Sequence, residues 1–205
     1  MNFLLFRQKM FDLACFNINQ LYAWQPDFNR NNFGHWIKQG HIIRLRNGLY
    51  TFPEYVGRPG YQYYFANRMY RPSYISLHSA LSFYGLIPEA TVQITSISSL
   101  KTAEFSNACG TFTYNSVKER AMFGYEPKML ADGRAFLLAS PEKALVDLLY
   151  IYPFYNSEKE LLNLRLDGSG LSEDVDSGKL KEYSFRIGSK ALDSRTNKLI
   201  KAYGL

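Results

Sequence analysis

The stretch DFNRNNFGHWIKQGHIIRLRNGLYTF, residues 27–52, decides how the N-terminal end of this chain folds. Its spacing predicts an amphipathic helix that runs directly into a two-stranded hairpin. Asp27 or Asn29 can cap the helix, because their side-chain oxygens accept the free amide protons of a first turn. Gly40 then stands where a left-handed residue would end the helix.

The predicted helix has two chemically different faces. The apolar positions recur at i, i+3 and i+4 and are Phe33, Trp36 and Ile37. The opposite side and its flanks carry cations, amides and an imidazole, at Arg30, Asn31, Asn32, His35, Lys38 and Gln39. Side chains of these types suit base edges and phosphates. On an isolated helix the same stripe would be an ordinary solvated face, and that alternative stays open.

The hairpin is predicted from the dipeptide Asn47-Gly48, which lies between two β-prone runs. A type I′ turn needs positive φ at both central residues, and this dipeptide is its strongest short-range signal. The expected register is Arg46 with Leu49, Leu45 with Tyr50, Arg44 with Thr51 and Ile43 with Phe52. Alternation then turns Arg44 and Arg46 outward, where a guanidinium can hold a phosphate or enter a minor groove.

The segment upstream supplies the other helices of a small DNA-binding module. Apolar residues at helical spacing from Phe3 to Ala14 predict a first helix, and Asn17 followed by Gln20 is typical of a capping box at the start of a second. Three helices and a hairpin within residues 1–55 predict a winged helix-turn-helix domain that binds DNA. The same helix and hairpin could instead simply pack on the neighbouring domain.

Composition excludes several classes of protein. The chain has 205 residues, 46% of them hydrophobic, which is enough for one or two domains with a real core. Nothing approaches 18 consecutive apolar residues, and MNFLLF at the start lacks a basic leader, so we expect neither a membrane span nor a secretory signal. Cys15 and Cys109 show no pairing pattern, and two Cys with three scattered His give no metal-ligand spacing. We therefore expect a cytoplasmic protein with reduced thiols, no metal and no cofactor.

The net charge of +6 is unevenly distributed. Residues 1–70 contain eight Lys and Arg against three acids, an excess of +5, whereas residues 71–205 hold 16 basic against 15 acidic residues. The positive excess thus belongs to the part that is predicted to touch phosphates.

Residues 53–60, PEYVGRPG, are rich in turn formers and predict a boundary before a larger mixed α/β domain, residues 60–205. The elements expected there are helices near 63–70, from Ser76 to Tyr84, from Ser140 to Pro153, from Ser157 to Leu166 and around 192–203, and strands at 92–98, 111–117 and 135–139. Residues 167–178 are expected to form a polar loop, and Arg195 to lie on the outside of the last helix. The fold class that follows is α+β.

Several segments of the chain resemble one known family. They are SYISLHSALSFYGLIPE (73–89), QITSI (93–97), GTFTY (110–114), ASPEKALVDLLY (139–150) and, in the N-terminal part, GHIIRLRNGLY (40–50). Together they look like the AbiE-type (AbiEi) antitoxins of bacterial toxin–antitoxin operons, and the resemblance spans nearly the whole chain. It implies a winged helix-turn-helix repressor that binds inverted repeats in its own promoter, with a second domain that counteracts a nucleotidyltransferase-like toxin. Family-type DNA contacts would fall on Arg30, Lys38, Arg44 and Arg46, and the family gives no catalytic residue to carry over.

Two short patterns resemble enzyme motifs. Residues 140–143 match the S-x-x-K pattern of penicillin-recognising enzymes, but the partner motifs are missing and Ser140 is explained as a helix cap. Asp174 and Asp176 after Gly168-Ser169 resemble the carboxylates with which nucleotidyltransferases hold two magnesium ions, but we expect them in a solvated loop.

A third candidate is a carboxylate cluster of Glu89, Glu142 and Asp147, as in a metal-dependent nuclease. It lacks a lysine at nuclease-like spacing, and Glu142 already suits a helix start. His78 is expected to be a packing or surface residue rather than a base. The sequence therefore predicts no enzyme.

The predicted function is that of a DNA-binding antitoxin and transcriptional autorepressor. Its partners would be double-stranded operator DNA and, functionally if not by contact, a nucleotidyltransferase-like toxin. Two alternatives remain: a promoter-binding regulator whose second domain senses a ligand or partner, and a DNA-processing enzyme that the winged domain targets. The predicted DNA-binding residues are Arg30, Asn31, Asn32, His35, Lys38, Arg44, Arg46 and Asn47.

Overall fold

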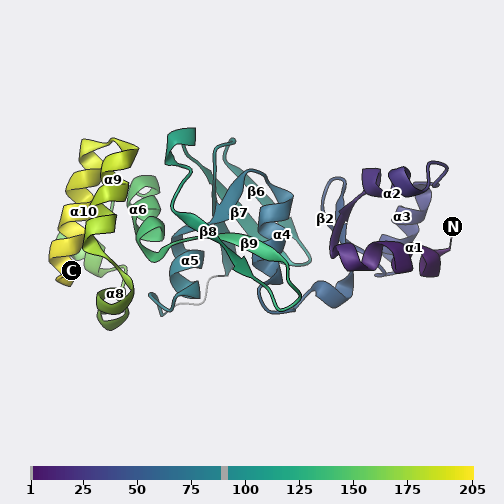
Figure 1. Ribbon diagram of the computed structural model, residues 1–205, viewed down its shortest axis with the longest axis horizontal. Helices are drawn as coiled ribbons and strands as arrows, with labels where there is room; N and C mark the ends of the chain where they lie inside the picture. The colour runs from purple at the N-terminus through teal and green to yellow at the C-terminus, as the bar shows by residue number, and fades with distance from the viewer. Residues whose placement is uncertain (1, 89–91) are drawn as a thin grey trace.

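The computed structural model describes residues 2–88 and 92–205 and has an α+β fold, as the sequence predicts (Figure 1). Its N-terminal unit (residues 2–55) contains, in chain order, α1 (Phe3–Met10), β1 (Cys15–Asn17), α2 (Ile18–Trp24), α3 (Asn31–Lys38), β2 (Ile43–Arg46) and β3 (Leu49–Thr51), with short 3₁₀ turns η1 (Phe11–Leu13) and η2 (Pro53–Tyr55). The strands form an antiparallel sheet in the order β1-β3-β2.

An aromatic core holds the N-terminal unit together. Phe6 of α1 lies in its middle, with its ring centroid 4.6 Å from Trp36 and 5.7 Å from Phe33 of α3. Phe52 packs on the same ring from the strand side, at 5.7 Å. Because these rings are almost fully buried, each removes a large apolar area from water and fixes α3 against the sheet.

The second unit (residues 60–205) is built around a six-stranded mixed sheet in the order β6-β7-β5-β4-β9-β8. Its first elements are α4 (Tyr61–Met69), β4 (Ser73–Ile75), α5 (Leu77–Phe83), β5 (Gln93–Ser98), β6 (Ala103–Asn107), β7 (Gly110–Ser116), η3 (Glu119–Ala121), β8 (Tyr125–Met129) and β9 (Ala135–Ala139). The pairs β5–β7 and β4–β9 are parallel, and the other neighbours are antiparallel. Strands β6 and β8 are therefore the edges of the sheet.

The chain ends in a layer of helices that packs against the sheet from the side away from the N-terminal unit (Figure 1). They are α6 (Pro141–Ile151), α7 (Glu158–Leu162), α8 (Gly168–Asp174), α9 (Ser177–Ile187) and α10 (Lys190–Tyr203). Helix α6 lies between α5 and the pair α9 and α10. As a result α6 is buried along most of its length, including its charged positions.

Several capping signals in the sequence are confirmed. Asn17 and Gln20 form a capping box at the start of α2, as do Ser157 and Glu160 at α7. The hydroxyl of Ser140 accepts the amide proton of Lys143 at the start of α6. These short polar side chains satisfy amides that a first helical turn leaves free.

Other expectations are wrong. Residues 167–178 are not a loop, because the Asp167 and Asp176 side chains cap α8 and α9. Arg195 is not on the outside: it is buried, and its Nε donates to the carbonyl of Leu149. Ser76 stands at the start of α5, but its hydroxyl donates to Asp147 and leaves the helix without a side-chain cap.

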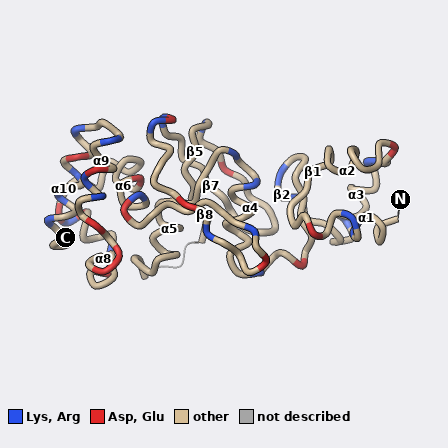
Figure 2. Tube along the Cα trace, in the orientation of Figure 1, with Lys and Arg blue, Asp and Glu red and all other residues tan. Residues whose placement is uncertain are grey.

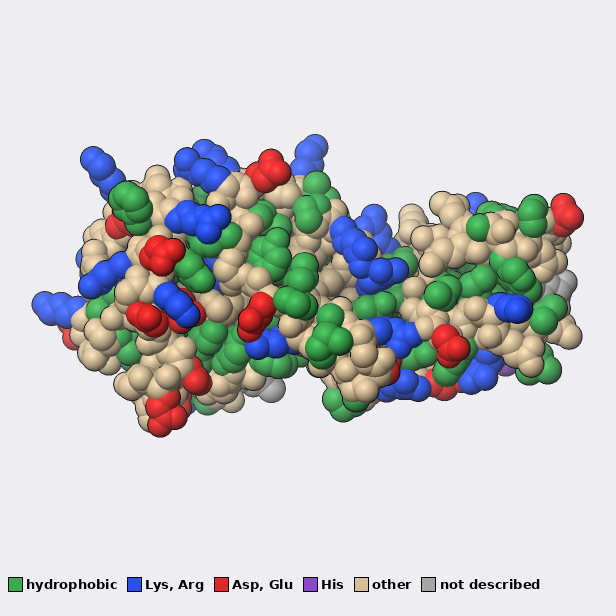
Figure 3. Space-filling view, in the orientation of Figure 1, with side chains coloured by type: hydrophobic (Ala, Val, Ile, Leu, Met, Phe, Trp, Pro, Cys, Tyr) green, Lys and Arg blue, Asp and Glu red, His purple; other side chains and the backbone are tan. Residues whose placement is uncertain are grey.

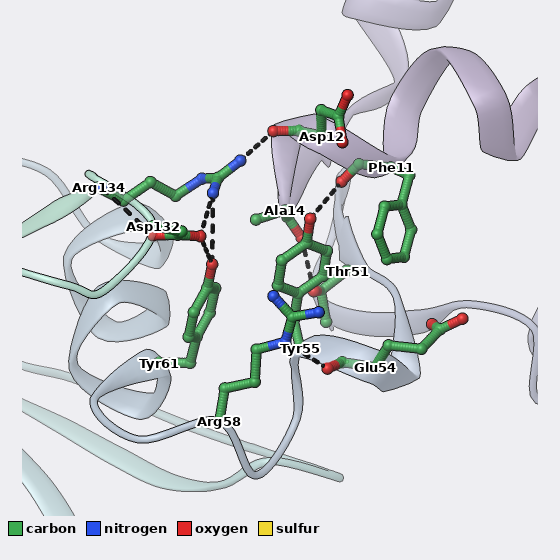
Figure 4. Close-up of polar contacts among 10 residues, drawn as sticks. All are labelled: Phe11, Asp12, Ala14, Thr51, Glu54, Tyr55, Arg58, Tyr61, Asp132 and Arg134. Carbon is green, nitrogen blue, oxygen red and sulfur yellow. Dashed lines mark hydrogen bonds and ion pairs between the residues drawn. The ribbon is translucent and has the colours of Figure 1, made fainter.

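The two units meet on the side of η1 and the β8–β9 turn (Figure 4). Arg134 donates to the carbonyl of Asp12 in the N-terminal unit and forms an ion pair with Asp132, which also accepts from Tyr61. Nearby, the Tyr55 hydroxyl donates to the carbonyl of Phe11 at 2.8 Å. The Arg134 bond attaches the β8–β9 turn of the second unit to η1, and the Tyr55 bond holds η2 against η1 within the N-terminal unit.

Candidate nucleic-acid interface

Helix α3 is positioned by its apolar face, which the sequence predicts. Phe33 and Trp36 are buried and Ile37 is half-buried, so the opposite side must face outward. The helix begins at Asn31: Asn29, one of the two predicted caps, accepts the amide proton of Asn31 at 2.9 Å, whereas the residue before the helix, Arg30, makes no side-chain cap bond. Gly40 follows the helix with φ +72°, the left-handed conformation expected of the residue that ends it.

The polar face of α3 is exposed. Arg30, Asn31, His35 and Lys38 are exposed and line one hollow, whereas Asn32 is half-buried and does not line it. This hollow of about 470 Å³ runs along the polar face and is lined by Arg30, Asn31, Phe33, Gly34, His35, Ile37, Lys38 and Tyr50. Tyr50 was not predicted as part of this surface, because strand alternation places it inside.

The hairpin β2–β3 follows α3 directly, but its geometry differs from the prediction. Gly48 has positive φ whereas Asn47 does not, so the turn is not of type I′. The register slips by one residue between Arg44 and Arg46, so that Leu45 is a bulge. A bulge re-aims the side chains on either side of it.

This bulge separates the two predicted arginines. Arg44 is exposed, as expected, and Asn47 is exposed at the turn. Arg46 instead faces the second unit, where its Nη1 donates to the carbonyl of Met69 and its guanidinium carbon lies 4.9 Å from the centroid of the Phe105 ring. The prediction that both arginines point outward is wrong for Arg46. Thr51, which the expected register pairs with the outward-facing Arg44, is instead buried and donates to the carbonyl of Ala14.

A groove of about 650 Å³ lies between β2 of the N-terminal unit and β6 of the second unit. Arg44 and Asn47 line one wall, and Glu104 and Ser106 line the other. Figure 2 shows basic residues on β2, and Figure 3 shows Lys and Arg side chains gathered where the N-terminal unit meets the rest of the molecule. The β6 wall was missed from the sequence, because AEFSN has too few β-branched residues to signal a strand.

The cations of the exposed surface have no acidic partner in the part of the chain that the structure describes. Among residues 2–88 and 92–205 no ion pair or hydrogen bond engages the side chains of Arg30, Lys38 or Arg44. Arg7, by contrast, is bound to Glu54 at 2.8 Å. Unneutralised cations on an exposed helix and hairpin can attract and hold phosphate oxygens.

The residues weighed as enzyme motifs form a closed structural cluster. Lys143 and Asp147 are an ion pair with no exposed side-chain surface, and the hydroxyls of Tyr74 and Ser76 donate to Asp147 at 2.9 and 2.8 Å. The hydroxyl of Ser140 meanwhile accepts at the helix start. These bonds occupy the Asp147 carboxylate, the Lys143 ammonium and the hydroxyls of Tyr74 and Ser76 inside the protein.

The metal-site candidates are not assembled in the described part of the chain. No group of three or more His, Cys, Asp or Glu there could hold a metal ion. Glu89, one of the proposed nuclease carboxylates, lies outside the described residues. Asp176 caps α9 with its side chain rather than lying free in a loop.

Both cysteines are free. Burial raises the pKa of Cys15 to about 12 and that of Cys109 to about 11, so both thiols are protonated at neutral pH and weak nucleophiles. Within the described residues, no helix combines the length and the apolar character that crossing a membrane requires.

No protein-family model matches the chain, and no curated protein matches it.

Proposed function

We propose that this chain is a DNA-binding antitoxin and transcriptional autorepressor, which reads operator DNA with α3 and holds the backbone with β2–β3. It acts by binding rather than by catalysis. The operator would contain inverted repeats in the promoter of its own operon.

The order of elements in the N-terminal unit supports a winged helix-turn-helix. In that motif a second, recognition helix enters the major groove and a β-hairpin follows it. Here α2 and α3 are followed at once by β2–β3, and β1 completes the small sheet. The helix in the recognition position is α3.

The observation that carries the proposal is the uncovered polar face of α3. An α-helix with its side chains is about 10–12 Å across, so α3 can enter a major groove about 12 Å wide. Along it, Asn31 can donate and accept towards an adenine edge, and Lys38 can reach a guanine or a phosphate. No part of the second unit lines the hollow beside these residues.

The antitoxin part of the proposal rests on the family resemblance of residues 73–89, 93–97, 110–114 and 139–150. These segments form β4, α5, β5, β7 and α6, which together make the centre of the second unit. The partner that the second unit counteracts is inferred from the resemblance alone.

DNA binding is tested by fluorescence anisotropy with the chain's own promoter fragment and with random duplex of equal length. Asn31→Ala with His35→Ala should reduce the preference for the promoter by roughly tenfold or more, because each lost base contact is worth about 1–3 kcal/mol. Lys201→Ala, on the exposed side of α10, is the matched control and should leave the preference unchanged. A promoter preference that survives the double substitution would show that α3 does not read bases.

Antitoxin function is tested by co-expression with the neighbouring open reading frame. Growth rescue by the full chain from the toxicity of a nucleotidyltransferase-like neighbour is the expected result. Promoter binding without rescue would favour a regulator with no antitoxin role.

A further inference from the structure

The end of the hairpin is fastened to the second unit. The guanidinium of Arg46 bonds to the carbonyl of Met69 at the end of α4 and lies over the Phe105 ring of β6, with Tyr70 at 6.0 Å. We call these three interactions the Arg46 contact. A guanidinium that stacks on an aromatic face while bonding to a carbonyl is held in both direction and plane.

A second bond from the second unit reaches the same strand. The side-chain amide of Asn107 donates to the carbonyl of Leu45 at 2.9 Å. Leu45 is the bulged residue, so its carbonyl is free of the β2–β3 ladder and can accept from outside. The bulge thus accounts for both interactions between the hairpin and the second unit: it frees the Leu45 carbonyl for Asn107, and it turns the Arg46 side chain towards Phe105.

Arg44 gives the contrast within the same strand. It lies two residues away, is exposed, and has no partner among the described residues. In an unbulged strand the two side chains would lie on the same face. To reach a phosphate, Arg46 would have to break its hydrogen bond to a carbonyl and its contact with an aromatic face. Arg44 would break no interaction with the described residues.

We propose that Arg46 is a positioning residue and not a DNA contact: through it the sheet of the second unit sets the direction in which hairpin β2–β3 projects. Its effect on DNA rests on the proposed function, whereas the attachment itself does not. The hairpin is then fixed from outside the N-terminal unit, and whatever displaces β6 changes how the hairpin faces a duplex.

The attachment is tested without DNA, by hydrogen exchange of the full chain. Arg46→Ala should speed exchange of the backbone amides in residues 44–50 by on the order of tenfold, given the usual strength of a charge-assisted hydrogen bond and a cation–π contact. Phe105→Ala should speed the same amides, and the double variant should add little to either. Arg44→Ala is the matched control and should leave exchange unchanged, as should the amides of α9 and α10 in every variant.

Unchanged hairpin exchange in both Arg46→Ala and Phe105→Ala would overturn the proposal. Phe105→Ala also serves if Arg46→Ala fails to fold. A general rise in exchange throughout the protein would count against a positioning role, because a loss of overall stability does not single out the hairpin.

The consequence for DNA is tested by the salt dependence of binding. Arg44→Ala should flatten the slope of log K against log salt by about 0.9, the value for one phosphate contact. Arg46→Ala and Phe105→Ala should weaken binding by a similar factor at every salt concentration and keep the wild-type slope. A slope change for Arg46→Ala equal to that for Arg44→Ala, with Phe105→Ala silent, would make Arg46 a phosphate contact. If the wild type binds no DNA at all, the proposed function fails and the exchange experiment still decides the attachment.

Discussion

The buried ion pair of Lys143 and Asp147 gives the sharpest test of how the second unit is stabilised. Both side chains lie on α6 one turn apart, and neither is exposed to solvent. Asp147 also accepts from Tyr74 and Ser76, whereas the Lys143 ammonium lies over the faces of Phe123, at 4.8 Å, and Tyr74, at 5.6 Å. The negative charge of Asp147 is therefore stabilised by more hydrogen bonds than the positive charge of Lys143.

That inequality sets the expected magnitudes. Removing one member of a buried pair costs about 3–5 kcal/mol, because it leaves the other charge unpaired. Lys143→Met should lower the free energy of unfolding by an amount near the lower end of this range, since two hydroxyl donors still stabilise the Asp147 carboxylate. Asp147→Leu should lower it by an amount near the upper end, since it leaves the Lys143 ammonium without its ion-pair partner and the Tyr74 and Ser76 hydroxyls without their acceptor. The double variant should be less destabilised than Asp147→Leu alone, at about 2 kcal/mol, the usual penalty for buried hydroxyls that lose their acceptor.

The assay is urea unfolding of the four proteins, followed by intrinsic fluorescence and by circular dichroism. A double-mutant cycle from these data isolates the coupling between the two side chains. If the double variant is destabilised by the sum of the two single changes, the pair is not coupled, and the reasoning from burial fails.

Three further predictions concern local structure and pH. Gly40→Ala should lower the free energy of unfolding by about 1–2 kcal/mol in urea titrations, because φ is +72° although nothing lies within 4 Å of an added Cβ. Burial raises the pKa of Tyr61 from its ordinary 10.0 to about 12, so its contribution to stability is complete below pH 10 and is lost as the pH rises towards 12; Tyr61→Phe should remove that loss in alkaline thermal melts. The Ser169 hydroxyl and Gly170 amide hold the pKa of Asp167 below its ordinary 3.8, so the start of α8 should loosen as the pH falls below 3.8; amide exchange that does not change there in acid would contradict this.

The N-terminal unit shows how far local pattern carries a prediction. The apolar face of α3, its glycine end and the capping box of α2 are all set by residues within one or two turns, and all are confirmed. The orientation of Arg46 depends on a bulge at Leu45 and on Phe105, almost sixty residues away. Strand alternation assumes an unbroken ladder, so it could not predict that orientation.

The second unit departs from the pattern for a different reason. Helical periodicity assigns charges to the solvent side, but α6 has neighbours around most of its circumference, so Lys143 and Asp147 are buried with the leucines. Strand β8 was missed because Pro127 lies within it, which an edge strand tolerates. Neither fact is visible until the tertiary neighbours are known.

The structure also changes what the charge of the N-terminal part means. Of the eight cations in residues 1–70, the structure engages four internally: Arg7, Arg46, Arg58 and Arg68. Three of the others, Arg30, Lys38 and Arg44, lie on the candidate interface. If each neutralises one phosphate, one copy of the chain should bind duplex with a slope of log K against log salt of about −2.7. A charge count alone would predict a slope more than twice as steep. A measured value near −7 per copy would mean that arginines now engaged within the protein are released to the DNA, and the hairpin could not then be held as described.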